Sequence, residues 1–426
     1  MTKFHFYNDR TSADTLPTKL RKRMHEHGLI SADGNNLVSF CGMLADSSGI
    51  NIFLPRSSEL SDKNHRAKIK TASQLMRSIE RYGRESATSV DSMDEGEGVI
   101  GAEQLSLIKS LLIDYRNNGL YLRRQTLKTK NTGKPDWGRT IARSIPFPNL
   151  RHQPIFLDVF GTKRLYSSDS EVSKIHASVI RKLDTKYSWL LGEQEGSSLH
   201  ELKDIVNPQG DVKYQLAILQ RELSLIYSER EIYLLSQLSK ILANDSGVLL
   251  SNFIVGLQRY HHAWEFMLKH ILQYSVDLNS KLPAPVYINQ DGSIQNAFER
   301  GMRADIFIMP PKTNELIVFD AKYYAARTVE SSPRWSDLVK QFFYAKALQT
   351  SFPDHLISNA FIFPGKHGVF KQVRMKSRVN TKISQFEDMH FSPIECYYIC
   401  PLFVIEKFVT GGVLSQEQLK ALQNSH

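Results

Sequence analysis

Two aspartates and one lysine stand at the ends of two neighbouring expected strands. The chain around Asp305 alternates between two faces, and a second apolar run ends at Asp320 and Lys322, which lie two positions apart and therefore share one face. Between the two runs, a Pro-Pro pair and a Thr-Asn pair indicate a turn. If an antiparallel hairpin pairs Met309 with Leu316, the same register places Asp305 opposite Asp320. Two carboxylates and one ammonium group would then converge on one patch.

Such a patch is suited to metal-assisted hydrolysis of a phosphodiester. Carboxylates this close repel each other and attract a divalent cation, and hard oxygen ligands favour Mg²⁺. Lys322 could orient or deprotonate a water, or stabilise charge on a phosphate. The alternative is that Asp320 and Lys322 form an ordinary cross-strand surface pair. That is less expected here, because Asp320 ends an apolar strand and Asp305 also lies among apolar residues.

Two expected helices flank these strands. The spacing of apolar residues predicts a helix over 336–348, with Gln341 and Tyr344 three positions apart and able to reach toward the strands. Upstream, it predicts a helix over 253–274, where Glu265 lies beside the apolar stripe. A carboxylate at the edge of a buried face is either solvated or functional, and the helix pattern leaves both open.

In this order of elements the sequence resembles the PD-(D/E)xK nuclease superfamily. More narrowly, it is similar to the McrC-like restriction subunits, and to their LlaJI-type members in particular. The resemblance is fairly specific over about the last 170 residues and looser before them. An alanine, Ala304, stands where the superfamily typically has proline, which leaves the acid in place. The motifs that carry the resemblance are Arg303–Asp305, Phe319–Tyr323, Gln341–Ala345, Asp136–Ile141 and Pro154–Phe156.

The resemblance implies a Mg²⁺-dependent DNA endonuclease of an anti-phage restriction system, with Mn²⁺ able to replace Mg²⁺. It also implies a separate McrB-like AAA+ GTPase as partner and double-stranded DNA as substrate. Cleavage of both strands would require at least a dimer. By the same resemblance, the metal would be held by Asp305, Asp320 and the backbone carbonyl of Ala321, with Glu265 completing the shell. Lys322 would act on water and Gln341 would support the site or the DNA, while Glu299 is a fallback for Glu265.

The net charge of +10 is concentrated in two stretches. Residues 115–143 carry eight basic residues and one acidic residue, and residues 366–382 carry six basic residues and none that are acidic. Basic side chains are often merely solvated, but a bias this strong indicates contact with a polyanion or a partner. The candidate DNA contacts are Arg123, Arg124, Lys128, Lys130, Lys371, Arg374, Lys376 and Arg378.

We expect an α/β fold, α+β overall, in three domains. An N-terminal α+β domain would span 1–110, with a β-hairpin over 37–56 and an acidic linker or loop at 86–98. A basic and helical region for partner or DNA contact would span 111–248. A nuclease core of the restriction-endonuclease type would span 249–426, with the main boundary near 245–250.

Several classes of protein are excluded or disfavoured. The longest apolar stretch is too short to span a membrane, and the N-terminus has no secretory pattern. Three cysteines favour a reducing, cytoplasmic setting over a disulfide framework. The segment 133–140 nearly matches a P-loop, but it lacks a preceding buried strand, so no nucleotide site is expected. Cys396 and Cys400 lack the second pair of ligands that zinc needs and are expected in the core.

Two other functions stay open from the sequence. The chain could be a docking module that activates a ring NTPase and cleaves weakly or not at all. It could also be an autonomous type II restriction enzyme. The first 245 residues would distinguish partner-dependent from autonomous action, and their sequence favours neither.

Overall fold

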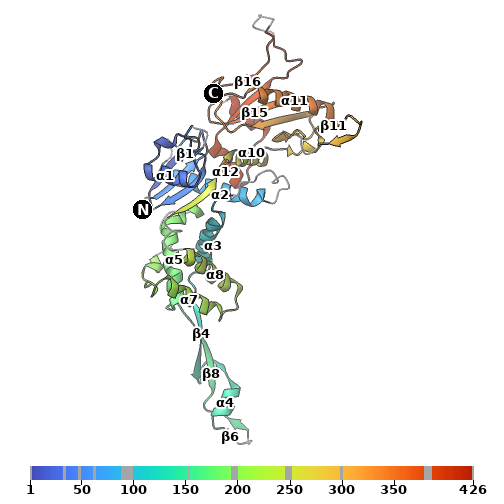
Figure 1. Ribbon diagram of the computed structural model, residues 1–426. Coiled ribbons are helices and arrows are strands. Elements are labelled where there is room, and N and C mark those ends of the chain that lie inside the picture. The colour runs from blue at the N-terminus through green and yellow to red at the C-terminus, as the bar shows by residue number, and fades with distance from the viewer. Residues whose placement is uncertain are drawn as a thin grey trace. The chain divides into compact units, whose positions relative to one another are not determined.

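A computed structural model describes residues 2–31, 35–46, 49–60, 64–87, 99–151, 153–192, 200–244, 252–297, 301–378 and 386–424. The chain forms two compact units, coloured by residue number in Figure 1. Unit 1 is Glu103–Asn252, and unit 2 combines Thr2–Ala102 with Phe253–His426. Helices and mixed sheets confirm the α/β class. The three-domain division stays a prediction, and the expected acidic linker and main boundary lie largely outside the described residues.

The first sheet of unit 2 joins segments that are far apart in the sequence. Its order is β1 (Phe4–Asn8), β3 (Gly49–Leu54), β2 (Cys41–Asp46) and β9 (Phe253–Leu257). β1 runs parallel to β3, and the other neighbours are antiparallel. The β2–β3 pair confirms the hairpin predicted over 37–56.

The helix predicted over 253–274 is wrong at its start. Residues Phe253–Leu257 form β9, and the helix α10 covers only Tyr260–Ile271. The β-branched pair before Gly256 favours a strand, and the glycine fits a close approach, because a Cβ there would lie 2.3 Å from the carbonyl oxygen of Cys41. β9 therefore ties the C-terminal half of unit 2 to the N-terminal sheet.

The second sheet of unit 2 has six strands in the order β10-β13-β14-β15-β17-β16. β14, β15 and β17 are parallel, whereas β13 is antiparallel to β14. Ile306 pairs with Phe319, which is the register predicted for the hairpin. The strands are β10 (Ser275–Val276), β13 (Ile306–Ile308), β14 (Glu315–Ala321), β15 (Leu356–Pro364), β16 (Gln372–Val373) and β17 (Ile394–Ile399).

Helices bury both sheets of unit 2. The predicted helix over 336–348 is present as α11, and its residue Leu348 packs against Phe307 and Val318 of the second sheet. The long helix α2 contacts α10 and α12. The remaining elements include a hairpin of β11 and β12. The bounds are α1 (Thr18–Glu26), α2 (His65–Ser86), α11 (Trp335–Ser351), α12 (Pro401–Thr410), α13 (Gln416–Asn424), β11 (Val286–Ile288) and β12 (Ile294–Asn296).

Unit 1 is a group of helices that carries a β-ribbon. Helices α3, α5, α7 and α8 form this group, and the chain breaks between α7 and α8 near Ser228. Figure 1 shows the ribbon of β4 and β8 leading away from these helices. We call residues 123–167 the arm. The helices are α3 (Ala102–Asn118), α5 (Glu171–Tyr187), α6 (His200–Lys203), α7 (Val212–Leu223) and α8 (Glu229–Asn244); the arm holds β4 (Arg123–Lys130), β5 (Lys134–Pro135), α4 (Trp137–Arg143), β6 (Phe147–Pro148), β7 (Pro154–Ile155) and β8 (Phe160–Ser167).

Candidate active site

The pairing of β13 with β14 brings two aspartates together. Because Ile306 lies opposite Phe319, the next residues along the hairpin, Asp305 and Asp320, come opposite each other. An Asp305 carboxylate oxygen, Oδ2, accepts a hydrogen bond from the Ala321 backbone N–H at 2.7 Å. Burial and the neighbouring Asp320 carboxylate raise the pKa of Asp305. The strand ends thus hold the two carboxyl groups close together in a partly desolvated place.

Lys322 lies between two carboxylates. Its Nζ is 2.6 Å from Oδ2 of Asp320 and 2.8 Å from Oδ1 of Asp337. Burial by itself would lower the pKa of Lys322, but the Asp320 and Asp337 carboxylates outweigh it and raise that pKa above its ordinary value. The side chain is therefore an ammonium ion near neutral pH. This favours orienting water or stabilising phosphate charge over taking a proton from water.

Asp337 is a site residue that the sequence reasoning missed. It is the third residue of α11, and its second carboxylate oxygen accepts from the backbone N–H of Arg334 at 3.1 Å. An acid at this position of a helix usually signals only a capping interaction. Here the same carboxylate also holds Lys322, so a single residue caps α11 and fixes the lysine.

Glu265 reaches the same place from α10. The helix is anchored by Trp264, whose side chain is fully buried, and Glu265 is half-buried beside it. Burial first, and then the Asp305 and Asp320 carboxylates, raise the pKa of Glu265. Glu265 is therefore within electrostatic range of both aspartates, and its role at the site stays a prediction.

Gln341 and Tyr344 both bond to strand backbones rather than to the carboxylates. Gln341 is fully buried and its Nε2 donates to the carbonyl oxygen of Ala360 in β15 at 3.1 Å. The Tyr344 hydroxyl donates to the carbonyl oxygen of Arg303 at 2.6 Å, just before Asp305. Both therefore support strands of the site, and the buried position of Gln341 argues against contact with DNA. Glu299 lies outside the described residues.

The donor set at the strand ends fits a hard divalent cation. Among the described residues, no group of three or more His, Cys, Asp and Glu side chains forms a ready-made metal cage. Mg²⁺ does not require one, because it commonly binds through one or two carboxylates and keeps several waters. Asp305 and Asp320 are such a pair: burial and the Asp320 carboxylate raise the pKa of Asp305, and a cation between the two groups would remove their repulsion.

The candidate DNA contacts fall into two groups of four, one in β4 of unit 1 and one near β16 of unit 2. Several are paired with acids: Arg123 Nε lies 3.2 Å from Glu222, and Lys130 Nζ lies 2.8 Å from Asp158. Arg374 forms an ion pair with Asp388. The side chains of Arg124, Lys128, Lys371, Lys376 and Arg378 are exposed.

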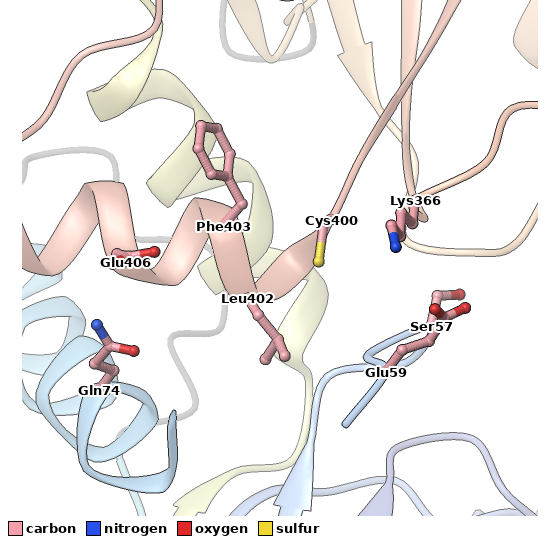
Figure 2. A pocket seen from close by; sticks show the side chains of 8 residues that line it. All are labelled: Ser57, Glu59, Gln74, Lys366, Cys400, Leu402, Phe403 and Glu406. Atoms are coloured by element: carbon pink, nitrogen blue, oxygen red, sulfur yellow. The ribbon is translucent and has the colours of Figure 1, made fainter. Parts of the chain in front are cut away.

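A pocket of about 290 Å³ in unit 2 is separate from this site. Figure 2 shows Lys366 and Ser57 on one side of it and Gln74 and Glu406 on the other. None of the carboxylates at the strand ends lines it. Its walls are formed by Ser57, Glu59, Gln74, Lys366, Cys400, Leu402, Phe403 and Glu406.

Comparison with known proteins assigns the family. The family described as LlaJI restriction endonuclease matches residues 40–382. The chain belongs to the LlaJI restriction endonuclease family. The match extends from the start of β2 past β16, so it includes unit 1 as well as Glu265, Asp305, Asp320 and Lys322. As a LlaJI family member, the chain is a nuclease of a restriction system, as the resemblance implied.

Individual relatives of this LlaJI family member are distant. It is 21% identical over 351 residues to the type II restriction enzyme BsuMI component YdjA of Bacillus subtilis strain 168, a match that covers 79% of this chain and 74% of that protein. Similar solved structures include a half-complex of Thermococcus gammatolerans McrB AAA+ hexamers with bound McrC, with a TM-score of 0.38 and 12% identity over 96% of this chain and 99% of the other. The McrBC complex of the same organism gives a TM-score of 0.27 and 10% identity, covering 62% and 85%.

In the part of the chain that the structure describes, no helix is both long enough and apolar enough to cross a membrane.

Proposed function

We propose that this chain is the Mg²⁺-dependent, DNA-cleaving subunit of its restriction system and acts on double-stranded DNA in the cytoplasm. The observation that carries the proposal is the convergence of Asp305, Asp320 and Lys322 at two paired strand ends. Burial and the two aspartates also raise the pKa of Glu265. A surface ion pair does not explain this group, because its carboxyl groups are desolvated and repel one another.

Each residue has a role in this proposal. Asp305, Asp320 and the Ala321 carbonyl would hold the cation, and Glu265 would complete its shell through a carboxylate or a bound water. When bound, the cation would polarise the scissile phosphate and make an attacking water more acidic. The Lys322 ammonium group would stabilise negative charge on the phosphate and orient the water. Asp337 would hold Lys322 in place, and Gln341 would keep β15 beside β14.

We further propose that the arm contacts a protein partner, a McrB-like AAA+ GTPase. The arm exposes large apolar side chains: the relative exposure is 55% for Trp137, 65% for Ile141, 79% for Ile145 and 66% for Leu157. Exposed apolar side chains gathered in this way are typical of interaction sites. The related BsuMI protein is named as a component of a restriction enzyme, which also favours a system of several subunits.

Two alternatives remain distinguishable from this proposal. A docking module would stimulate the GTPase without cleaving DNA itself. An autonomous type II enzyme would cleave without any GTPase, and the words "type II restriction enzyme" in the name of the BsuMI relative favour it.

The test is cleavage of plasmid DNA in Mg²⁺, with and without the neighbouring AAA+ protein and GTP. The proposal expects cleavage by the wild type and none by Asp320→Ala or Lys322→Ala. A matched control is Asp14→Asn, which removes an exposed carboxylate paired with Arg21 at 2.9 Å in the N-terminal part of the same unit. Wild-type rates for Asp320→Ala would overturn the site. Cleavage without the partner would favour the autonomous enzyme.

A further inference from the structure

Tyr323, the residue directly after Lys322, is held by the N-terminal sheet. Its hydroxyl oxygen accepts a hydrogen bond from the backbone N–H of Arg56 at 3.0 Å, and the same hydroxyl is near enough to the Asp9 carboxylate to lower the pKa of that group. The Cys41 Sγ is 3.7 Å from this oxygen. The Tyr323 carbonyl oxygen in turn accepts from Nη1 of Arg56 at 3.3 Å. Both the side chain and the backbone of Tyr323 are thus tied to another sheet.

The residues that hold Tyr323 come from the ends of three strands. Asp9 follows β1, Cys41 begins β2 and Arg56 follows β3. Asp9 is 3% exposed, and its carboxylate accepts from the Phe40 backbone N–H at 3.2 Å. Burying a carboxylate is costly unless it is hydrogen-bonded. Asp9 therefore sits in a built polar cluster at this edge of the N-terminal sheet, and Tyr323 completes that cluster.

The Tyr323 ring also contacts the helix that carries Glu265. The ring centroids of Tyr260 and Trp264 lie 5.5 and 6.2 Å from that of Tyr323. Trp264 precedes Glu265 in α10, just as Lys322 precedes Tyr323. Tyr323 is therefore next to Lys322 in the chain, and its ring contacts the residue that is next to Glu265.

The backbone on both sides of Lys322 is fixed. The Lys322 N–H donates to the carbonyl oxygen of Ile362 at 2.9 Å, inside the nuclease sheet. The next carbonyl, that of Tyr323, is fixed by Arg56 in the N-terminal sheet. The end of β14 is thus held between two sheets, and a displacement of about 1 Å in a catalytic group can cost about 10²-fold in rate.

We propose that Tyr323 is a positioning residue through which Asp9 and Arg56 hold Lys322 and Asp320 in their reactive arrangement. The N-terminal sheet is then part of the catalytic apparatus and not only an accessory domain. This inference rests on the proposed nuclease function and adds residues that the catalytic motif does not contain. The competing explanation is that Tyr323 contributes to stability alone.

The test is single-turnover cleavage of a labelled duplex in Mg²⁺ by full-length Tyr323→Phe, under conditions in which the wild type cleaves. The expected result is a fall of about 10- to 100-fold in the maximal rate, with unchanged affinity for DNA measured in Ca²⁺. The control is Tyr398→Phe. Its hydroxyl likewise accepts from a backbone N–H, that of Phe370, and it donates to the carbonyl oxygen of Ala326 at 2.9 Å.

A wild-type maximal rate in Tyr323→Phe, or an equal loss in Tyr398→Phe, would overturn the inference in favour of a purely structural role. If Tyr323→Phe does not fold, Arg56→Met decides, because it keeps the backbone N–H and an unbranched side chain but has no side-chain donor for the Tyr323 carbonyl. It should lower the rate without changing DNA affinity, and a wild-type rate would contradict the inference. A wild type that cleaves under no condition would instead refute the proposed function.

Discussion

The site of unit 2 and the arm of unit 1 differ in the exposure of their charged and apolar side chains. At the site, Lys322 is only 16% exposed and its charge is matched by two aspartates. In the arm, Arg124 and Lys128 are exposed, and so are apolar side chains such as Ile145, which is 79% exposed. Buried, paired charges hold the site side chains in one arrangement. Exposed apolar and basic side chains are instead typical of surfaces that bind a partner.

This contrast separates chemistry from recognition. Changes in unit 2 should alter the rate of bond cleavage at a given occupancy of DNA. Changes in the arm should alter dependence on the partner and leave the chemistry intact. The following predictions test that separation, from the largest expected effect to the smallest.

Removal of the divalent cation should have the largest effect. Chelation with EDTA should abolish cleavage, because the facing carboxylates cannot by themselves polarise a phosphate, and added Mg²⁺ or Mn²⁺ should restore it. The measurement is plasmid cleavage followed on gels across a metal titration. Full activity in EDTA would show that the carboxylates of unit 2 serve another purpose.

Loss of an apolar anchor in the arm should act only through the partner. Trp137→Ala should weaken binding of the AAA+ partner by about tenfold or more, as for a central aromatic anchor of an interface. Partner affinity can be measured by interferometry, alongside cleavage in Mn²⁺ without the partner. A variant that binds the partner normally but cleaves slowly would contradict the assignment of recognition to the arm.

Removal of the Asp337 charge should slow cleavage moderately. Asp337→Asn keeps an oxygen for the helix cap but loses one of the two charges that hold Lys322. A fall of about tenfold in single-turnover rate corresponds to the loss of one charged hydrogen bond, at about 1.5 kcal/mol. DNA affinity should not change, and a weaker affinity with a normal rate would place Asp337 in DNA binding instead.

The smallest expected effect is on the stability of unit 1 and not on activity. His176 is buried, its Nδ1 accepts from the Tyr121 N–H at 3.0 Å, and burial lowers its pKa to about 4. The unfolded chain takes up a proton below about pH 6.5 whereas folded His176 stays neutral, so stability is lost as pH falls from 6.5 toward 4. At one pH unit below the pKa of the unfolded state, the free energy of unfolding is lower by about 1.4 kcal/mol.

This pH dependence can be measured by urea unfolding at pH 7.5 and 5.5. His176→Asn places an acceptor near the position of Nδ1 and has no proton to gain, so its stability should differ less between the two pH values. An equal pH dependence in wild type and variant would show that other groups cause it.

Much of the site could be predicted because it depends on local pattern. The apolar run before Asp320, the turn that precedes it and the alternation around Asp305 were enough to give the register that pairs Ile306 with Phe319. The spacing within α10 also predicted that Glu265 lies beside the apolar stripe of its helix, whereas its assignment to the site came only from the resemblance.

The parts that could not be predicted depend on contacts between distant segments. The sequence does not predict β9, because an apolar run directly before an amphipathic helix fits the helical period as well as a strand. Only the pairing of β9 with β2 distinguishes the two structures. The polar cluster around Tyr323 joins residues more than 260 positions apart. The sequence does not predict β4, because this exposed strand lacks the alternating apolar face of a half-buried strand.

The most direct test of the central claim is single-turnover cleavage of an end-labelled duplex in Mg²⁺ by wild type and Asp305→Asn. Asparagine keeps an oxygen that can accept from the Ala321 N–H, so the fold should be preserved. It removes the charge proposed to bind the cation. We predict cleavage by the wild type and a loss of about 10³-fold or more in the variant, equivalent to several kcal/mol. Cleavage by Asp305→Asn at the wild-type rate would contradict the account.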